Sequence, residues 1–260
     1  MVEHFQNRRI DEPMARQVAE QRILPVRAEL DEREEFPWDL IKEMASSDLL
    51  RVFVPEEYDG LGGGCFDLCL VVEELSRVCG GIAISYAANA LGVLPLILYG
   101  SDAQKAKYLP AVANGSRLAA FAVTEATAGS DASAIRTSAR RDGDHYVLNG
   151  TKQFITNGGE AEIYTVVVMT DAAKGSRGAS ALVVEKGTPG FTFGKKEKKM
   201  GIRSSATREL VFRDCHVPAE NLISREGMGF IVAMRTLDRS RPGVGAQALG
   251  IAQGALEAAA

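Results

Sequence analysis

The richest set of hydrogen-bonding groups in the sequence lies between Phe121 and Asp131. This segment begins with residues typical of a strand and ends in a turn, where Ser130 or Asp131 could cap a helix. Three side-chain hydroxyls and several backbone amides fall close together here. Such groups suit a polar, planar or phosphorylated ligand. Strand–turn–cap segments are common, so this segment alone does not define a site.

A second polar segment, residues 149–158, reads N-G-T-K-Q-F-I-T-N-G. The Phe154 ring could stack on a planar ligand, and the Thr156 hydroxyl could hydrogen-bond to it. The alternative reading is purely structural. In that reading Phe154 and Ile155 fill a β core, and Thr124 and Thr156 are β-branched strand formers.

Other catalytic and metal-binding patterns are missing from the sequence. The histidines His4, His145 and His216 are isolated along the chain, and Cys65 and Cys69 lack the partners of a zinc site. We therefore predict that the chain binds no metal. It contains neither a Walker loop nor a G-x-G-x-x-G fingerprint. The four scattered cysteines favour reduced thiols over a disulfide framework.

The composition is that of an ordinary globular protein. The 260 residues are 46% hydrophobic and 25% charged, with a net charge of −4. This apolar content excludes disorder, and the mild acidity argues against a nucleic-acid partner, since phosphate binding needs a basic surface. Residues 78–101 are long enough to cross a bilayer, but their polar residues, glycines and proline favour a buried helix. We predict no membrane span.

Hydrophobic spacing divides the chain into three parts. Residues 1–116 are predicted to be helical. Residues 117–222 carry short β-type runs and turn dipeptides, typical of an antiparallel barrel or sandwich. The turn dipeptides are Asp142-Gly143, Asn149-Gly150 and Asn157-Gly158. Residues 223–260 return to helix. The predicted fold class is therefore α+β multidomain: an all-α domain, a middle domain built as an antiparallel β-barrel or sandwich, and the start of a helical bundle.

Three helices are predicted in the first part. One buries a face made of Phe36, Leu40, Ile41 and Met44. A second, after a glycine-rich break, buries Phe66, Cys69, Leu70, Leu75 and Val78. A third is short and polar, begins at Ser101, runs through Lys107 and is closed by Pro110 and Asn114-Gly115.

The last part is predicted to form one long helix with an apolar stripe. The stripe comprises Phe230, Met234, Leu237, Val244, Ala248, Ile251 and Ala255. Glycines that would let another helix approach are Gly243, Gly245, Gly250 and Gly254. Because the stripe has no following partner, we expect the polypeptide to be cut after Ala260 and a further helical domain to follow. The alternative is a helix that ends here and packs in an oligomer.

Two motifs in order make the chain resemble the acyl-CoA dehydrogenase family. Residues 121–131 match Y/F-x-V-T-E-x-x-x-G-S-D, and residues 149–158 match N-G-x-K-x-W/F-I-T-N-G. Further matches are residues 55–63, 200–207, 217–221, 237–242 and 248–253. The resemblance covers nearly the whole chain. It implies FAD as cofactor, an acyl-CoA substrate, electron-transfer flavoprotein as partner, and assembly as a homotetramer or dimer.

The resemblance also implies which residues bind flavin. They are Phe121, Val123, Thr124, Gly129, Ser130, Phe154, Ile155 and Thr156. Val123 and Thr124 would place amides or hydroxyls on the flavin edge, and Thr156 would place a neutral hydroxyl near its N5. Phe154 would stack on one face. Many relatives have Trp there, so an indole hydrogen bond is lost in this chain.

Substrate contacts are implied in the same way. They are Ser130, Ser205, Asp238, Ser240 and Arg241. Arg241 falls on the apolar stripe, where a guanidinium is costly unless paired, and pairing with Asp238 is the structural alternative. Residues 84–92 would line the acyl pocket, with Tyr86 as a candidate for shortening it. This segment has no Arg or Lys, which disfavours a dicarboxylic acyl group.

The family's chemistry needs a carboxylate base in an apolar pocket, where its pKa rises toward the working pH. The family does not use Glu125, which strand alternation places opposite Thr124. Some relatives carry the base where this chain has Ser240, and serine cannot serve. We therefore expect no catalytic residue in this chain and a base after Ala260. These 260 residues alone should bind flavin poorly and turn over little.

The predicted function is FAD-dependent α,β-dehydrogenation of an acyl-CoA thioester to the trans-2-enoyl-CoA, with electrons passed to electron-transfer flavoprotein. One alternative is an acyl-CoA oxidase on the same fold, which would reduce oxygen. Another is a truncated, non-catalytic binding or assembly homologue. The polar start of the chain lacks a signal core and an Arg-rich presequence. The expected location is therefore the cytoplasm, or the mitochondrial matrix in a eukaryote.

Overall fold

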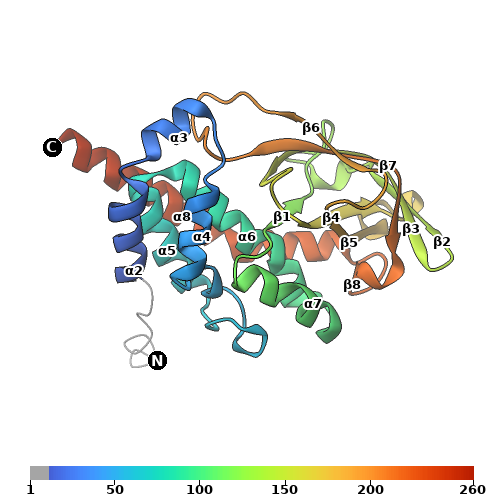
Figure 1. Cartoon of the computed structure of the whole chain (residues 1–260). Helices are drawn as coiled ribbons and strands as arrows, with labels where there is room; N and C mark the ends of the chain where they lie inside the picture. The colour runs from blue at the N-terminus through green and yellow to red at the C-terminus, as the bar shows by residue number, and fades with distance from the viewer. Residues whose placement is uncertain (1–11) are drawn as a thin grey trace.

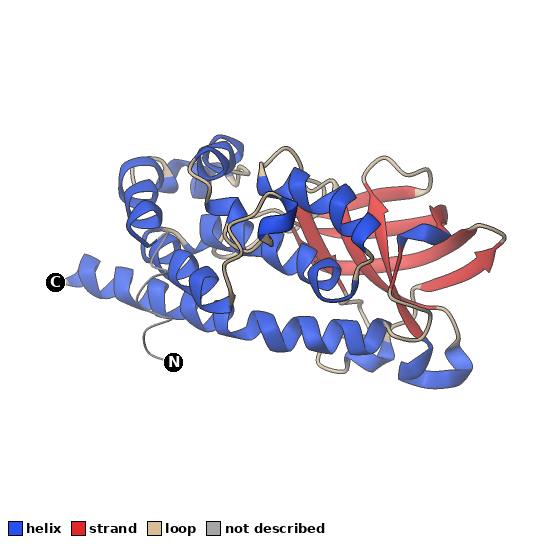
Figure 2. Cartoon of the chain, turned by 90° about the horizontal axis from the view of Figure 1, so that it is seen from below, coloured by secondary structure: helices blue, strands red, loops and turns tan. Residues whose placement is uncertain are grey.

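The computed structural model describes residues 12–260 and has helices at one end and a sheet at the other (Figure 1). The long helix α8, Gly229–Ala259, runs past both (Figure 2). The predicted fold class is confirmed, since N-terminal helices, a β-sheet and a C-terminal helix follow one another along the chain.

The N-terminal part is helical as predicted. Its helices are α2 Glu12–Val18, a π-helical turn Ala19–Ile23, α3 Arg27–Arg33, α4 Trp38–Ser46, α5 Cys65–Val78, α6 Gly80–Tyr99 and α7 Asp102–Ala113. Two 3₁₀ turns, Leu49–Arg51 and Glu56–Tyr58, join α4 to the loop before α5.

The buried faces of these helices match the predictions in part. The predicted face of α4 is confirmed, because Leu40, Ile41 and Met44 are buried; Phe36 is buried too, but it precedes the helix, which begins at Trp38. On α5 the prediction is wrong for Phe66, which is 58% exposed. The prediction is confirmed for Leu75 and Val78, which are buried together with Val71 and Val72. Helix α5 packs against α2, α6 and α8, and these contacts decide which of its residues are buried.

Helix α7 begins where the sequence predicts but extends past Pro110. Ser101 caps it as expected, with its hydroxyl accepting from the Gln104 N–H at 3.2 Å. Pro110 does not close it, and the helix continues to Ala113. It ends at Asn114, where the predicted Asn114-Gly115 stop lies. A proline removes its own helical donor, but its carbonyl still accepts, here from the Asn114 N–H at 3.1 Å.

Helix α6 is the element that brings the helices to the sheet. A Cβ atom at Gly92 would lie 2.6 Å from the Ala120 nitrogen, so only glycine lets α6 contact strand β1, Ala119–Ala122. Within residues 12–260, α6 is the one helix long and apolar enough to cross a membrane. Two thirds of its most apolar window is buried in this fold, as in the core helix that the sequence predicts.

The sheet has eight strands in the order β6-β7-β3-β2-β4-β5-β8, with β1 paired to β4. The strands after β1 are β2 Ser138–Asp142, β3 His145–Thr156, β4 Ile163–Met169, β5 Ala179–Glu185, β6 Phe191–Lys196, β7 Thr207–Pro218 and β8 Leu222–Ile223. The sheet is mixed, whereas the sequence predicted antiparallel strands. Ala122 pairs with Val166 and Ser138 with Met169, both in parallel. β1 and β2 therefore follow each other along β4, and residues 123–137 leave the sheet between them.

Two of the three predicted turns are turns. Gly143, with φ 61°, joins β2 to β3, and Asn157, with φ 60°, follows β3. Asn149-Gly150 is not a turn, since it lies inside β3 at an irregularity in the pairing with β7. Gly150 has φ 145°, and a Cβ there would be 2.7 Å from Thr137. A bulge needs the same backbone freedom as a turn, so the dipeptide signals both.

The predicted buried stripe of α8 is wrong in part, because four of its seven residues are exposed: Val244, Ala248, Ile251 and Ala255. The residues that α8 buries are Gly229, Val232, Ala233, Thr236, Gly243, Ala246, Gln247 and Gly250. Cβ atoms at Gly250 and Gly254 would lie 2.2 Å and 1.9 Å from carbonyl oxygens of α5. The close helix approach is confirmed at these two glycines. The face of α8 that contacts α5 therefore carries small residues, which let the two backbones approach, and its large apolar side chains lie on other faces.

Candidate active site

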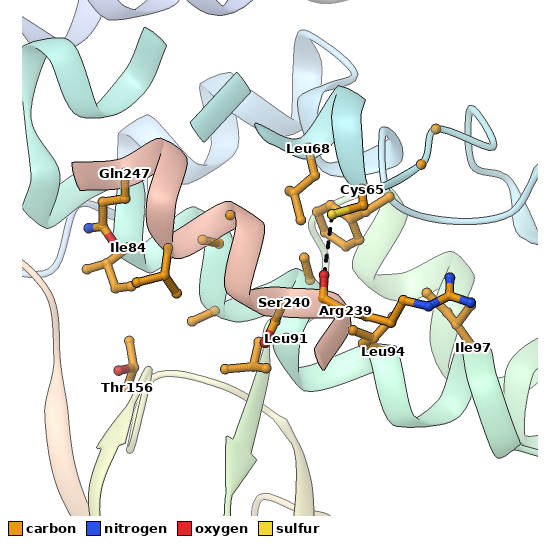
Figure 3. A pocket seen from close by; sticks show the side chains of 18 of the residues that line it. Cys65, Leu68, Ile84, Leu91, Leu94, Ile97, Thr156, Arg239, Ser240 and Gln247 are labelled. Atoms are coloured by element: carbon orange, nitrogen blue, oxygen red, sulfur yellow. Dashed lines mark hydrogen bonds between the residues drawn. The ribbon is translucent and has the colours of Figure 1, made fainter. Parts of the chain in front are cut away.

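An apolar cavity of about 220 Å³ lies between α5, α6 and α8, and Thr156 of β3 borders it (Figure 3). Helix α6 lines it with residues three or four positions apart, which share one helical face. They are Ile84, Ala87, Ala88, Ala90, Leu91, Leu94, Ile97 and Leu98. The predicted role of the 84–92 segment therefore agrees with this geometry.

Tyr86 does not line the cavity, so the expectation that it shortens the pocket is wrong. Its side chain is fully buried on another side of α6, where its hydroxyl donates to the Leu49 carbonyl at 2.9 Å. Each helical residue is rotated by about 100° from the last, so position 86 faces away from positions 84 and 88.

Helix α8 forms a second wall through Ser240, Gly243, Val244 and Gln247. The Gln247 amide donates to the Gly80 carbonyl at 3.1 Å, at the start of α6. The Cys65 thiol lies 3.4 Å from the Arg239 carbonyl oxygen, so α5 also contacts α8 at this cavity (Figure 3). Among residues 12–260, no Asp or Glu lines the cavity.

Asp238 and Arg241 lie outside the cavity. Their side chains pair at 3.0 Å and are 50% and 68% exposed. The premise that Arg241 occupies a buried apolar stripe is wrong, because α8 turns its small residues toward α5. The intrahelical pairing that we gave as the structural alternative is present.

Strand β3 presents an aromatic ring to solvent two residues before Thr156, which borders the cavity. The pairing of β3 with β7 slips between Lys152 and Ile155, and Phe154 has φ 58°, which is uncommon for a bulky residue. The Phe154 ring is 57% exposed, whereas Ile155 is buried in the main core. A bulge redirects side chains in this way. Phe154 and Thr156 are thus available to a planar ligand, and Ile155 offers only its backbone.

The 121–131 segment behaves as a strand followed by a turn, as predicted. The side chains of Phe121 and Val123 pack in a small core that includes Phe230 and Met234 of α8. Beyond Ala122 the chain leaves the sheet, and the Glu125 and Ala128 backbones exchange hydrogen bonds of 3.0 and 3.1 Å.

The end of this segment is a short capped turn. Gly129 and Ser130 are exposed. Asp131 caps the 3₁₀ turn Ala132–Ala134 by accepting from the Ser133 N–H at 3.0 Å. The predicted cap is confirmed, although the helix that it begins is only one turn long.

Ser205 is fully buried and does not line the cavity. Its N–H donates to the Ile202 carbonyl and its carbonyl accepts from Lys199 Nζ at 2.7 Å. Of the five predicted substrate residues, Ser240 alone borders the cavity, and Ser130 is an exposed residue of the 123–137 loop.

Glu125 is part of a buried ion pair. Lys152 Nζ lies 2.7 Å from a Glu125 carboxylate oxygen, and both side chains are buried. Burial lowers the pKa of Lys152 to about 8, although the Glu125 charge opposes this. Burial would raise the pKa of Glu125, but the Lys152 charge and hydrogen bonds outweigh it and hold that pKa below its ordinary value. A lowered pKa makes the carboxylate a weak base, and its oxygens already accept hydrogen bonds, so Glu125 is suited to structure and not to proton abstraction.

The histidines and cysteines form no metal site in the part of the chain that the structure describes. His145 and His216 are not isolated, because pairing of β3 with β7 brings their rings within 6.4 Å. His4 lies outside the described residues. All four cysteines are free thiols.

The sequence analysis missed several residues of the cavity, notably Cys65, Leu68, Leu94 and Gln247. The three-to-four spacing from Ile84 to Leu98 is visible in the sequence and could have extended the predicted lining of α6. Contributions from α5 and α8 depend on helix packing and carry no local signal.

Family models match two segments of the chain. Residues 9–116 match the N-terminal domain of acyl-CoA dehydrogenase, and residues 120–215 match its middle domain. The chain is 47% identical over 247 residues to the short-chain-specific acyl-CoA dehydrogenase of Clostridium acetobutylicum. That match covers 95% of this chain and 65% of the relative, so the chain spans about two thirds of its relative's length.

Solved structures give the same result. One reported for the electron transferring flavoprotein of Acidaminococcus fermentans matches with TM-score 0.93 and 48% identity, over 95% of this chain and 66% of that one. An acyl-CoA dehydrogenase of Bacillus anthracis complexed with FAD matches with TM-score 0.84 and 38% identity, over 92% and 40%. Together with the two motifs and the fold, these matches show that the chain belongs to the acyl-CoA dehydrogenase family of oxidoreductases.

Proposed function

We propose that this chain supplies the flavin-binding and acyl-binding walls of an FAD-dependent enzyme that dehydrogenates short-chain acyl-CoA thioesters. The observation that carries the proposal is the apolar cavity bordered by Thr156, two residues along β3 from the exposed Phe154 ring. FAD in a related structure and the short-chain specificity of a relative support it.

The residues present fit such a ligand pair. Phe154 offers an exposed ring for stacking on the isoalloxazine, and Thr156 offers a neutral hydroxyl donor. The walls formed by α6 and α8 would exclude water from the acyl chain, and a cavity of about 220 Å³ suits a short one. When bound, FAD would supply the acceptor for the electrons and hydrogen that leave the substrate.

Three further features belong to the proposal. The electron acceptor is an electron-transfer flavoprotein, which is supported by the match to a structure reported for such a flavoprotein. The enzyme assembles as a homotetramer or dimer. The base that removes the α-proton is not among the residues within 12–260 that line the cavity, since none of these lining residues is Asp or Glu.

The test is flavin binding followed by reduction. The 260-residue chain is mixed with FAD, and so is the full gene product where the gene extends past Ala260. Flavin absorbance is then measured after desalting. Anaerobic butyryl-CoA should then bleach the flavin of the full product, and air should restore the colour slowly. A full product that retains no flavin would contradict the proposal, and rapid peroxide formation in air would indicate an oxidase instead.

A further inference from the structure

The buried pair of Lys152 and Glu125 holds one end of the 123–137 loop. Besides its ion pair with Glu125, Lys152 Nζ donates to the Val123 carbonyl at 3.0 Å. The Lys152 side chain is completely buried and that of Glu125 is nearly so. Burying a lysine and a glutamate removes both charges from water, which costs desolvation free energy. The pairing of the two side chains offsets this cost.

Glu125 also fixes the other end of the same loop. Its two carboxylate oxygens accept backbone N–H groups of Arg136 and Thr137, at 2.7 and 3.0 Å. The carboxylate therefore joins the start of the loop, its end and strand β3 through one side chain. Charge-assisted hydrogen bonds of this kind are shorter and stronger than neutral ones.

These contacts set the direction of a backbone amide. The peptide bond between Val123 and Thr124 is trans, which places its C=O and N–H on opposite sides. Since the Val123 C=O points at Lys152, the Thr124 N–H points away from Lys152. The Gln153 N–H donates to the Thr124 carbonyl at 2.8 Å, so the next peptide unit is fixed by β3 as well.

We propose that Lys152, held by Glu125, is a positioning residue that aims the Thr124 backbone N–H at the edge of the bound flavin. This inference rests on the proposed FAD site. It adds that the donor is oriented before the cofactor arrives, so binding does not have to order the loop. Lys152 itself does not contact the cofactor.

The experiment separates positioning from stability with two variants. Lys152→Met removes the donor and leaves the Glu125 charge buried and unpaired, whereas Lys152→Met/Glu125→Gln removes the charge as well. Lys107→Met is the control. Lys107 of α7 also pairs with a glutamate, Glu185 of β5, at 2.8 Å, but this pair is partly exposed and does not contact the 123–137 loop. The measurements are the FAD dissociation constant by flavin fluorescence, the flavin midpoint potential, unfolding by urea, and hydrogen exchange of amides 121–130 without FAD.

We expect Lys152→Met to lose at least tenfold in FAD affinity and to exchange amides 123–128 faster. The double variant should recover urea stability but keep the weak affinity and a shifted midpoint potential, and Lys107→Met should bind FAD like the wild type. If FAD affinity recovers together with stability in the double variant, the positioning role is wrong. A wild type that binds no FAD would contradict the proposed function. In that case the exchange of amides 123–128 still tests whether Lys152 and Glu125 order the loop.

Discussion

The side-chain amide of Asn157 lies 3.0 Å from the Ser85 carbonyl oxygen and thereby joins the end of β3 to helix α6. The same nitrogen lies 3.3 Å from the Ala119 carbonyl oxygen of β1. Asn157 directly follows Thr156, so β3, α6 and β1 meet at the residue beside the proposed flavin-contacting hydroxyl. The position of that hydroxyl relative to the acyl cavity is set by these two hydrogen bonds.

We expect Asn157→Asp to destabilise the chain by about 1–3 kcal/mol, because a carboxylate of the same shape cannot donate to the two buried carbonyls. Urea unfolding measures the effect. Asn114→Asp is the control, since Asn114 uses only its side-chain oxygen, which accepts from the Ser116 N–H on the surface. Equal stability of the two variants would show that the Asn157 contacts contribute nothing.

The pH dependence of stability should reveal the Glu125–Lys152 pair. Glu125 has a lowered pKa in the folded chain, so it contributes stability above its ordinary value of 4.5, and this is lost as the pH falls through the folded pKa. Glu125→Gln leaves Lys152 unpaired and should cost about 3–5 kcal/mol near pH 7. The difference between the two proteins should shrink below pH 4.5. A difference that stays constant down to pH 3 would exclude an ionised Glu125 as the cause.

The strained backbone at Phe154 predicts an order of stability for two truncations. Phe154→Gly and Phe154→Ala both remove the ring, but only glycine adopts φ 58° without cost. The glycine variant should therefore be more stable than the alanine variant by about 0.5–1 kcal/mol, after allowing for the greater freedom of glycine in the unfolded chain. Thermal unfolding measures this. If alanine is the more stable of the two, the backbone at this position is relaxed.

Local signals in the sequence predicted much of the fold. The face of α4, the cap at Ser101 and the β-type runs of β4 and β5 follow from periodicity and turn chemistry, and the structure has them. The two ordered motifs identified the family. These features depend on residues close together in the chain, which is why one sequence is enough to find them.

Features that depend on long-range packing were predicted poorly. The slip of β3 against β7 that exposes Phe154 has no local signature, since it arises from register between distant strands. The buried face of α8 is chosen by the close approach of α5 at Gly250 and Gly254, not by the largest apolar side chains. Because α8 buries this face, Arg241 lies on the exposed side of the helix and pairs with Asp238. Hydrophobic spacing alone therefore did not predict its exposure.

Two glycines of α8 provide a last test, which compares the cavity with the helix contact. A Cβ at Gly243 would meet no atom within 4 Å, because that position faces the cavity, whereas a Cβ at Gly250 would lie 2.2 Å from the Glu73 carbonyl oxygen. Gly243→Ala should stabilise the helix by up to about 1 kcal/mol, since alanine has the higher helix propensity. It should also weaken binding of an acyl-CoA, because the added methyl occupies the pocket. Gly250→Ala should instead destabilise the chain by more than about 1 kcal/mol through overpacking. Urea unfolding and acyl-CoA titration of both variants measure these effects, and a stabilising Gly250→Ala would show that α5 and α8 do not touch at this point.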